Sequence, residues 1–311
     1  MELAPSYLFS LPDIAKYTPH REKLTSNQLF SKASFHLVET DFLIDYPKPS
    51  LPHVAFVGGI STKPSKILSD QFQSFMDSSE TGAVIVSFGS GLNGFPSDRM
   101  DTLIKAFKQR HDLHFIVKHG LLAHLEGNVM FSPWIPQNDL LGHNKTVAFF
   151  THCGNNGQFE ALYHGVPMVG FPLFADQYYN CERMRQRQYG LVLEFCSFDV
   201  EDIETALISI TTNKKYLYNI RNASHIFHGR SETPLQRASY WIDHVMRYGD
   251  TYIHSYCTDI PWYQYYLLDV FMGLTTLIFV IIYLLVQIFK CWQYVCSKSI
   301  DKHVIRKAKI H

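Results

Sequence analysis

Three short clusters of polar and aromatic residues lie close together in the middle of the chain. They read WIPQNDLL (134–141), HCGNNGQFE (152–160) and PLFADQ (172–177). They supply an aromatic ring, an imidazole, glycines, carboxylates and carboxamides. Such a set suits a ligand that has a flat base, an anionic group and several hydroxyls.

The second cluster is predicted to form an anion-binding turn. A buried strand, VAFF (147–150), ends just before His152, and a helix is expected to begin near Asn155. The free N–H groups and the positive dipole end of that helix favour a bound anion, to which His152 can donate a hydrogen bond. Gly154 and Gly157 allow the backbone to approach a ligand closely.

The other polar residues suit the remaining parts of a nucleotide sugar. Trp134, at the end of a strand, offers a flat face on which a base can stack. Glu160 can accept hydrogen bonds from the vicinal hydroxyls of a ribose, and Asp176 and Gln177 suit the hydroxyls of a sugar. Each of these residues alone is more often structural. Their occurrence in one short segment favours a pocket for a nucleotide diphosphate that carries a sugar.

The surrounding sequence predicts the elements that position these side chains. Apolar runs of strand length include VIVSF (84–88), HFIVK (114–118) and PMVGFP (167–172), and they alternate with segments of helical periodicity such as Met100–Phe107 and Ile203–Ile210. This alternation predicts an α/β fold with a doubly wound parallel sheet. Ligands of such sheets bind at the carboxyl ends of the strands.

A transmembrane helix is predicted over Val270–Phe289, a run of twenty residues without a charge. At about 1.5 Å per residue it spans the roughly 30 Å of hydrocarbon in a bilayer. Trp262 and Trp292 flank it, as is typical of membrane interfaces. Lysines and arginines gather after the helix, so the positive-inside rule places residues 290–311 in the cytosol and residues 1–268 outside it.

The two chain ends bear on targeting. Lys307 and Lys309 lie five and three places from the end, which resembles the dilysine signal for retrieval to the endoplasmic reticulum. Residues 1–6 have no basic region and no apolar core, so they are not a signal peptide. Either the transmembrane helix directs insertion or the chain is a fragment.

Composition excludes several classes of partner. The formal net charge is zero, which provides no basic field for nucleic acid. The six cysteines form no CxxC pair and no Cys/His zinc pattern. No Asp-x-Asp motif occurs that would indicate a metal–diphosphate site, so neither a metal nor a resident cofactor is expected.

The segment from Trp134 to Asn180 closely resembles the signature of the UDP-glycosyltransferases, the family that contains the UDP-glucuronosyltransferases. That signature runs W-x-P-Q-x-x-L-L, H-x-G-x-x-x-x-x-E, G-V-P and D-Q-x-x-N, and this sequence matches it throughout. The resemblance extends over roughly residues 30–311. It implies a GT-B fold, in which two Rossmann-like domains face each other and the carboxyl-terminal one binds the donor.

The resemblance also implies roles for individual residues. Trp134 would stack on the uracil, Glu160 would bind the ribose, and the sugar would lie at Asp176. The full set expected to bind the donor is Ser90, Trp134, Gln137, His152, Gly154, Asn156, Gly157, Glu160, Asp176 and Gln177. The implied reaction is an inverting displacement at the anomeric carbon by a hydroxyl of a small lipophilic acceptor. UDP leaves, and the UDP-sugar is a co-substrate.

The general base of the family is a histidine in an amino-terminal domain that would lie upstream of this chain, so no catalytic residue is assigned. The expected organisation is a remnant of the acceptor domain (1–60), a donor domain (61–250), a juxtamembrane segment (251–269), the membrane helix (270–289) and a basic tail (290–311). The alternative function is a non-catalytic, membrane-anchored UDP-sugar-binding or regulatory partner, which forms a homo- or hetero-oligomer with full-length relatives.

Overall fold

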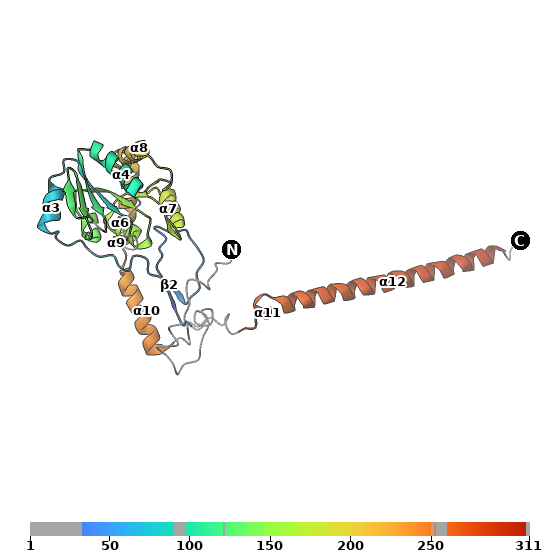
Figure 1. Cartoon of the computed structure of the whole chain (residues 1–311). Coiled ribbons are helices and arrows are strands. Elements are labelled where there is room, and N and C mark those ends of the chain that lie inside the picture. The colour runs from blue at the N-terminus through green and yellow to red at the C-terminus, as the bar shows by residue number, and fades with distance from the viewer. Residues whose placement is uncertain (1–32, 90–96, 121, 250–251, 253–259, 309–311) are drawn as a thin grey trace, which may run out of the picture. The chain divides into compact units, whose positions relative to one another are not determined.

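The computed structural model describes residues 33–89, 97–120, 122–249, 252 and 260–308 (Figure 1). Contacts between Cα atoms divide the chain into two compact units. Residues 34–253 form the larger unit, and residues 254–311 belong to the other. The larger unit contains the three clusters singled out in the sequence, and the smaller unit contains the long apolar helix.

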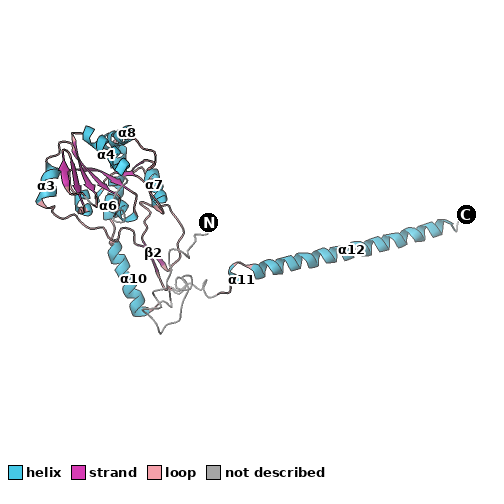
Figure 2. Ribbon diagram, viewed as in Figure 1, coloured by secondary structure: helices cyan, strands magenta, loops and turns pink. Residues whose placement is uncertain are grey.

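The larger unit is built on a sheet of seven strands within the described residues (Figure 2). In spatial order the strands are β5 (His124–Glu126), β6 (Val129–Ser132), β4 (Leu113–Lys118), β3 (Gly82–Ser87), β7 (Thr146–Thr151), β8 (Met168–Gly170) and β9 (Gly190–Val192). Neighbouring strands are parallel except for the antiparallel pair β5 and β6. The prediction of a doubly wound parallel sheet is confirmed.

Helices cover both faces of this sheet, because its central strands are apolar on both sides. Successive side chains of a strand point to opposite faces. Val84 and Val86 of β3 therefore join one buried cluster with Leu103 of α4, whereas Ile85 joins the other cluster with Leu162 of α6. The helices of the unit are α3 (Asp70–Asp77), α4 (Ser97–Gln109), α5 (Gln137–Leu141), α6 (Asn155–His164), α7 (Gln177–Gln186), α8 (Val200–Thr212), α9 (Lys214–His228) and α10 (Pro234–Tyr248).

The order of the strands reverses at the centre of the sheet. From β3 the chain moves outward through β4 to β6, and it then returns to β7 on the other side of β3. Connections that leave in opposite directions open a crevice at the carboxyl ends of the two central strands. Any ligand site of this sheet is therefore expected at the ends of β3 and β7.

The segment before residue 61 packs into the same unit. Its two short strands, β1 (His36–Val38) and β2 (Val54–Phe56), pair in parallel. Ile44 and Val57 are 1% and 3% exposed, and Ile44 belongs to the same buried cluster as Leu162 of α6. Residues 34–60, which the sequence predicted to belong to a remnant separate from residues 61–250, share one compact unit with residues 61–253 in the structure.

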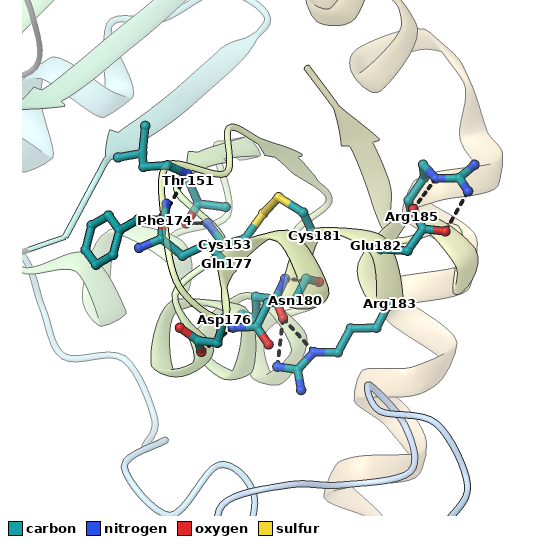
Figure 3. Close-up of a disulfide and its surroundings, with 12 residues drawn as sticks. Thr151, Cys153, Phe174, Asp176, Gln177, Asn180, Cys181, Glu182, Arg183 and Arg185 are labelled. Atoms are coloured by element: carbon teal, nitrogen blue, oxygen red, sulfur yellow. Dashed lines mark hydrogen bonds and ion pairs between the residues drawn. A yellow bond between two sulfur atoms is a disulfide. The ribbon is translucent and has the colours of Figure 1, made fainter. Parts of the chain in front are cut away.

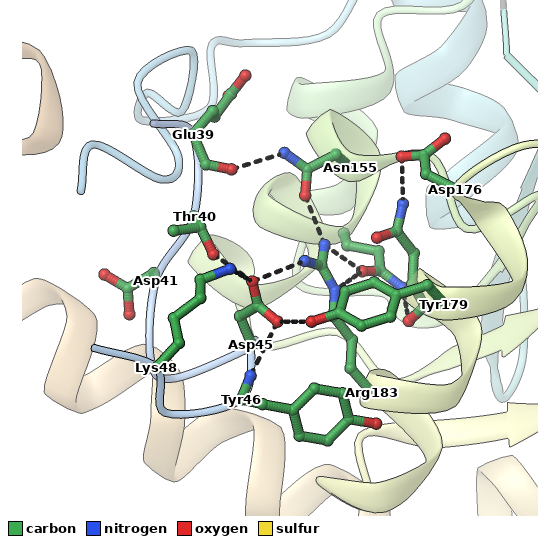
Figure 4. A network of polar contacts seen from close by, with 12 residues as sticks. Glu39, Thr40, Asp41, Asp45, Tyr46, Lys48, Asn155, Asp176, Tyr179 and Arg183 are labelled. Carbon is green, nitrogen blue, oxygen red and sulfur yellow. Dashed lines mark hydrogen bonds and ion pairs between the residues drawn. The ribbon is translucent and has the colours of Figure 1, made fainter. Parts of the chain in front are cut away.

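A buried polar network joins this segment to helix α7 (Figure 4). The Asp45 carboxylate accepts a hydrogen bond from Lys48 at 2.8 Å and one from the Tyr179 hydroxyl, and it lies 3.8 Å from the Arg183 guanidinium. Arg183 in turn donates to the side-chain oxygen of Asn155 at 2.5 Å, at the start of α6. The network therefore links the segment before residue 61, α7 and the first turn of α6.

Burial raises the pKa of the Asp45 carboxyl, but hydrogen bonds from Lys48, Thr40 and Tyr179 outweigh burial and hold that pKa well below its ordinary value. Burial and the bond to Asp45 raise the pKa of Tyr179 to about 12. Asp45 therefore stabilises the folded unit while it is ionised.

The smaller unit contains the short helix α11 (Trp262–Tyr265) and the long helix α12 (Leu268–Ala308). The stretch Leu268–Tyr294 of α12 has a mean hydropathy of 2.4 and is long and apolar enough to cross a membrane. None of that stretch is buried against other parts of the chain. The span predicted over 270–289 lies inside it, and the helix continues into the basic tail.

The Asp45 network makes a prediction about stability. We expect Asp45→Asn to lower the free energy of unfolding by about 3 kcal/mol at pH 7, because it leaves the buried Arg183 without its counter-charge. The pKa of Asp45 is depressed in the folded state. Its stabilisation is therefore complete above the pKa of the unfolded chain, near 3.9, and declines as the pH falls below that value.

Urea titrations of the unmodified chain and of Asp45→Asn between pH 3 and pH 8 measure this effect. Asp243→Asn is the matched control, because Asp243 pairs with Arg247 at 3.0 Å on the exposed surface of α10 and its loss should cost at most about 1 kcal/mol. Equal stability of Asp45→Asn and the Asp243→Asn control at pH 7 would contradict the role given to Asp45.

Candidate functional site

A pocket of about 820 Å³ lies at the carboxyl ends of β3 and β7. Ser87, Phe88 and Gly89 line it from the end of β3, and Thr151 and His152 line it from the end of β7. This is the crevice that the reversal of strand order opens. The remaining lining residues come mainly from α5, α6 and the loops that precede them.

The turn after β7 brings the start of helix α6 to the pocket. Gly154 is the N-cap of α6, and no side chain caps the helix there. Gly154, Asn155, Asn156 and Gly157 all line the cavity. The first N–H groups of a helix have no partner within it and carry a partial positive charge. The predicted turn and helix start are present at the cavity, and binding of an anion there stays a prediction.

His152 is held between two glycines at the edge of the cavity. A Cβ atom added at Gly154 would lie 2.5 Å from the His152 Nε2 atom, and one at Gly89 would lie 2.9 Å from it. Gly89 also has a φ of +90°, which favours glycine. A larger residue at either position would collide with the imidazole, so the two glycines set the position of His152.

Burial is the main influence on the charge of His152, and it lowers the pKa of the imidazole below the ordinary value. A hydrogen bond with the Ser87 backbone and, to a smaller extent, the charge of Asp176 partly offset this effect by stabilising the imidazolium form, whereas Lys118 adds to it. His152 is therefore mainly neutral at pH 7, a form in which one ring nitrogen carries a proton and the other can accept a hydrogen bond.

Trp134 projects from the loop that follows β6 and is 71% exposed. The Ser132 hydroxyl donates to the Trp134 backbone oxygen at 2.6 Å and fixes that loop. The Lys118 ammonium lies 5.0 Å from the centre of the indole ring and donates to the Gly89 backbone oxygen at 3.1 Å. The ring is thus exposed and lines the cavity, and the stacking of a base on it stays a prediction.

Glu160 and Gln137 form a pair on the same side of the cavity. The Gln137 side-chain nitrogen donates to a Glu160 carboxylate oxygen at 2.5 Å. Burial raises the pKa of Glu160, while the bond from Gln137 and the charge of Lys63 act in the opposite direction. The hydrogen bond from Gln137 holds the Glu160 carboxylate in one orientation at the cavity, where it can accept hydrogen bonds from hydroxyls.

The two residues expected to bind the sugar differ in position. Gln177 lines the cavity and is only 5% exposed, and its side-chain oxygen accepts from the backbone N–H groups of Leu173 and Phe174 at 2.9 and 3.2 Å. Its amide nitrogen is the group left for a ligand. Asp176 is exposed, lies outside the cavity lining and accepts from Asn180 at 2.7 Å.

The structure thus brings most of the predicted residues to one cavity. Those that line it are Trp134, Gln137, His152, Gly154, Asn156, Gly157, Glu160 and Gln177. Asp176 is not among the lining residues, and Ser90 lies outside the described residues. Sequence reasoning missed Lys118 and Lys63. A lysine at the carboxyl end of a predicted strand was the only signal available for Lys118.

Sequence reasoning also missed a disulfide next to the site. Cys153 and Cys181 are bonded, with their Cα atoms 5.3 Å apart and both side chains buried (Figure 3). The bond links the turn after β7 to helix α7. The 28-residue separation of the two cysteines gave no recognisable motif, and only the packing of α7 beside the turn brings them together.

The chemistry available at this site is that of anion and hydroxyl recognition. Helix-end N–H groups, His152 and Lys118 can bind phosphates, the Glu160–Gln137 pair can bind a diol, and Trp134 can stack on a base. Among the residues that the structure describes, no group of three histidines, cysteines or acidic residues is arranged to hold a metal ion.

The electrostatic surroundings of His152 make a second prediction. We expect its pKa to lie below 6.5 in the free protein, to fall further in Asp176→Asn, and to rise in Lys118→Met. Removing a carboxylate disfavours the imidazolium form, whereas removing an ammonium favours it. NMR titration of the imidazole protons, assigned by comparison with His152→Ala, measures all three values. A rise of the His152 pKa in Asp176→Asn, or a fall in Lys118→Met, would refute this account. The distant Asp243→Asn variant should show no shift.

Comparisons with known proteins identify the family of the chain. The model of the family described as "UDP-glucoronosyl and UDP-glucosyl transferase" matches residues 13–306. The chain is 36% identical over 278 residues to UDP-glucuronosyltransferase 1A9 of Mus musculus, which covers 88% of the chain and 52% of that protein. It is 35% identical over 282 residues to UDP-glucuronosyltransferase 1A10 of Homo sapiens, which covers 90% of the chain and 53% of that protein.

Solved structures of GT-B glycosyltransferases share the fold. The glycotransferase of kitacinnamycin superposes with a TM-score of 0.60 at 19% identity, over 75% of this chain and 60% of that one. A UDP-glucosyltransferase from Polygonum tinctorium superposes with a TM-score of 0.56 at 19% identity, over 70% and 54%. The chain spans about half the length of the curated relatives it matches. On the match over residues 13–306, the chain belongs to the UDP-glucuronosyl and UDP-glucosyl transferase family.

Proposed function

We propose that this chain supplies the donor-binding half of an inverting glycosyltransferase. In this function a sugar, either glucuronic acid or a hexose, passes from a UDP-sugar to a hydroxyl of a small lipophilic acceptor. The observation that carries the proposal is a single cavity at the switch point of the sheet. It combines an exposed indole, a helix start beside an imidazole, and an oriented carboxylate.

The cavity accounts for each part of the donor. Uracil stacks on Trp134, and the ribose hydroxyls donate to Glu160, which Gln137 holds in place. The diphosphate lies at the start of α6, where backbone N–H groups converge with His152 and Gly157. The sugar extends toward Gln177, with Asp176 at the edge. In this placement each group of UDP-sugar meets a side chain or backbone group of matching chemistry.

The same groups favour departure of UDP. When the acceptor oxygen attacks the anomeric carbon, the bond from that carbon to the diphosphate oxygen breaks and negative charge builds on the diphosphate. The helix-end N–H groups, His152 and Lys118 are already positioned around that charge, so they stabilise it without rearrangement. This arrangement explains how the leaving group is stabilised by protein groups of this chain.

The acceptor side follows from the family resemblance. We expect the base that deprotonates the acceptor to be a histidine of an amino-terminal domain, and we place the acceptor between that domain and the donor cavity. A homo- or hetero-oligomer with full-length relatives is the other arrangement that would bring such a base to this cavity. No metal and no resident cofactor take part in this scheme.

We place the donor unit in the lumen of the endoplasmic reticulum. The apolar stretch Leu268–Tyr294 would anchor the chain once, and the basic residues after it favour a cytosolic tail. The buried disulfide supports the lumenal side, because disulfides persist in oxidising compartments and are rare in the cytosol. Lys307 and Lys309 would retain the protein by retrieval.

Titration of UDP into the full chain in lipid nanodiscs tests the proposal. We expect His152→Ala and Glu160→Ala each to weaken UDP binding by about 1–3 kcal/mol, the range for losing a hydrogen bond to a charged or buried group. His225→Ala and Glu201→Ala, two exposed helix positions, are matched controls and should bind UDP like the unmodified chain.

Unchanged UDP affinity in both site variants would refute the assignment of the cavity. Assays for UDP release with UDP-glucuronic acid, UDP-glucose and phenolic acceptors then separate the two functions that the sequence left open. Binding with turnover supports the transferase. Binding without turnover by the chain alone corresponds to the donor-binding partner.

A further inference from the structure

The disulfide holds a strained backbone at the edge of the cavity. Cys153 has a φ of +62°, in the left-handed region that residues with a Cβ rarely adopt. It directly follows His152, so its backbone conformation determines the direction of the imidazole. The disulfide anchors Cys153 in this conformation to helix α7 (Figure 3).

The surroundings are shaped around this bond. Gly170, at the end of β8, lies against both sulfur atoms. A Cβ atom there would be 2.4 Å from the Cys153 Sγ atom and 2.5 Å from the Cys181 Sγ atom. Helix α7 is itself fixed on its other side, because Arg183 donates to Asn155 and lies beside Asp45 (Figure 4). Cys153 is therefore tied to an element that cannot easily follow it.

We propose that the Cys153–Cys181 disulfide is a positioning element of the donor site, which holds Cys153 in the left-handed conformation and thereby aims His152 at the diphosphate. This inference rests on the proposed binding of UDP. Without the bond, a non-glycine residue at position 153 relaxes toward ordinary backbone angles and the imidazole turns away. A glycine at position 153 adopts the left-handed conformation without the bond.

The test is a set of UDP titrations on the full chain in nanodiscs. We expect Cys181→Ala to weaken UDP binding by about fivefold to tenfold. The double variant Cys153→Gly/Cys181→Ala should return to within about twofold of the unmodified chain. In a His152→Ala background, Cys181→Ala should have no further effect on affinity, since residues that act through one group are not additive. Circular dichroism establishes that each variant is folded.

The outcomes are separable. If the unmodified chain does not bind UDP, the proposed function fails. If it binds UDP and folded Cys181→Ala binds equally well, the positioning role is wrong. The role is also wrong if the glycine variant fails to recover affinity, or if the Cys181→Ala effect persists without His152. A bond that only stabilised the fold would produce neither the recovery nor the dependence on His152.

A separate observation concerns a modification site. Two Asn-x-Ser/Thr sequences occur in the chain, Asn144-Lys145-Thr146 and Asn222-Ala223-Ser224. Asn144 is exposed in the turn before β7. Asn222 is also exposed, but it lies inside helix α9, and Ser224 two residues on is 8% exposed, with its hydroxyl bonded to the Tyr163 backbone oxygen at 2.7 Å. The turn at Asn144 can be bound in the active site of a modifying enzyme. The sequence at Asn222 cannot, because it is held in a helix and its Ser224 is packed against the rest of the unit.

We infer that Asn144 carries an N-linked glycan, given the lumenal placement in the proposed function. The oligosaccharide passes from a lipid diphosphate carrier to the Asn144 amide nitrogen, which loses a proton as the diphosphate leaves. Asn144 lies before the amino end of β7, whereas the cavity lies at its carboxyl end, about 20 Å away along a six-residue strand. The glycan therefore leaves the donor site open.

Translation of the full chain with and without microsomes tests this inference. With microsomes, we expect a mobility shift of one glycan that N-glycosidase reverses, that Asn144→Gln abolishes and that Asn222→Gln leaves unchanged. Protease protection in the same samples separates the alternatives. A protected donor unit without a shift refutes the glycan alone, whereas an unprotected donor unit refutes the lumenal orientation and the glycan with it.

Discussion

The reversal of strand order between β3 and β7 is the constraint on which the site depends. Because the chain leaves these neighbouring strands toward opposite edges of the sheet, their carboxyl ends border a crevice. The turn after β7 and the start of α6 therefore face an open cavity, with the end of β3 opposite them. Both buried clusters serve this arrangement, since they fix the two central strands from either face.

Several contacts around helix α7 make the turn after β7 rigid. Arg183 is a buried cation that needs partners, and it finds them in Asp45, Asn155 and Gln158. Asp45 belongs to the segment before residue 61, and Asn155 and Gln158 belong to helix α6. A covalent bond on the other side of α7 adds to this bracing. Preorganised donors bind a developing charge more strongly than mobile ones.

The apolar stretch of α12 follows a different rule from the α/β unit. Among the described residues it is not buried against the rest of the chain, and a lipid environment would remove its apolar side chains from water. The hydropathy of this stretch alone was therefore enough to identify it. The α/β unit instead buries its apolar residues against itself, and its site arises from how its elements pack.

The sequence by itself determined the fold class, the family and most of the cavity. Strand and helix periods are local properties, and residues such as Trp134, Glu160 and Gln177 lie within one segment whose order along the chain follows the sheet. What tertiary structure decided was every contact between distant segments. Packing of α7 beside the turn made the Cys153–Cys181 bond, and close approach of β4 placed Lys118 over Trp134. Packing also drew residues 34–60 into the larger unit through Asp45 and Ile44. No periodicity encodes such pairings, because they depend on which faces of separate elements meet.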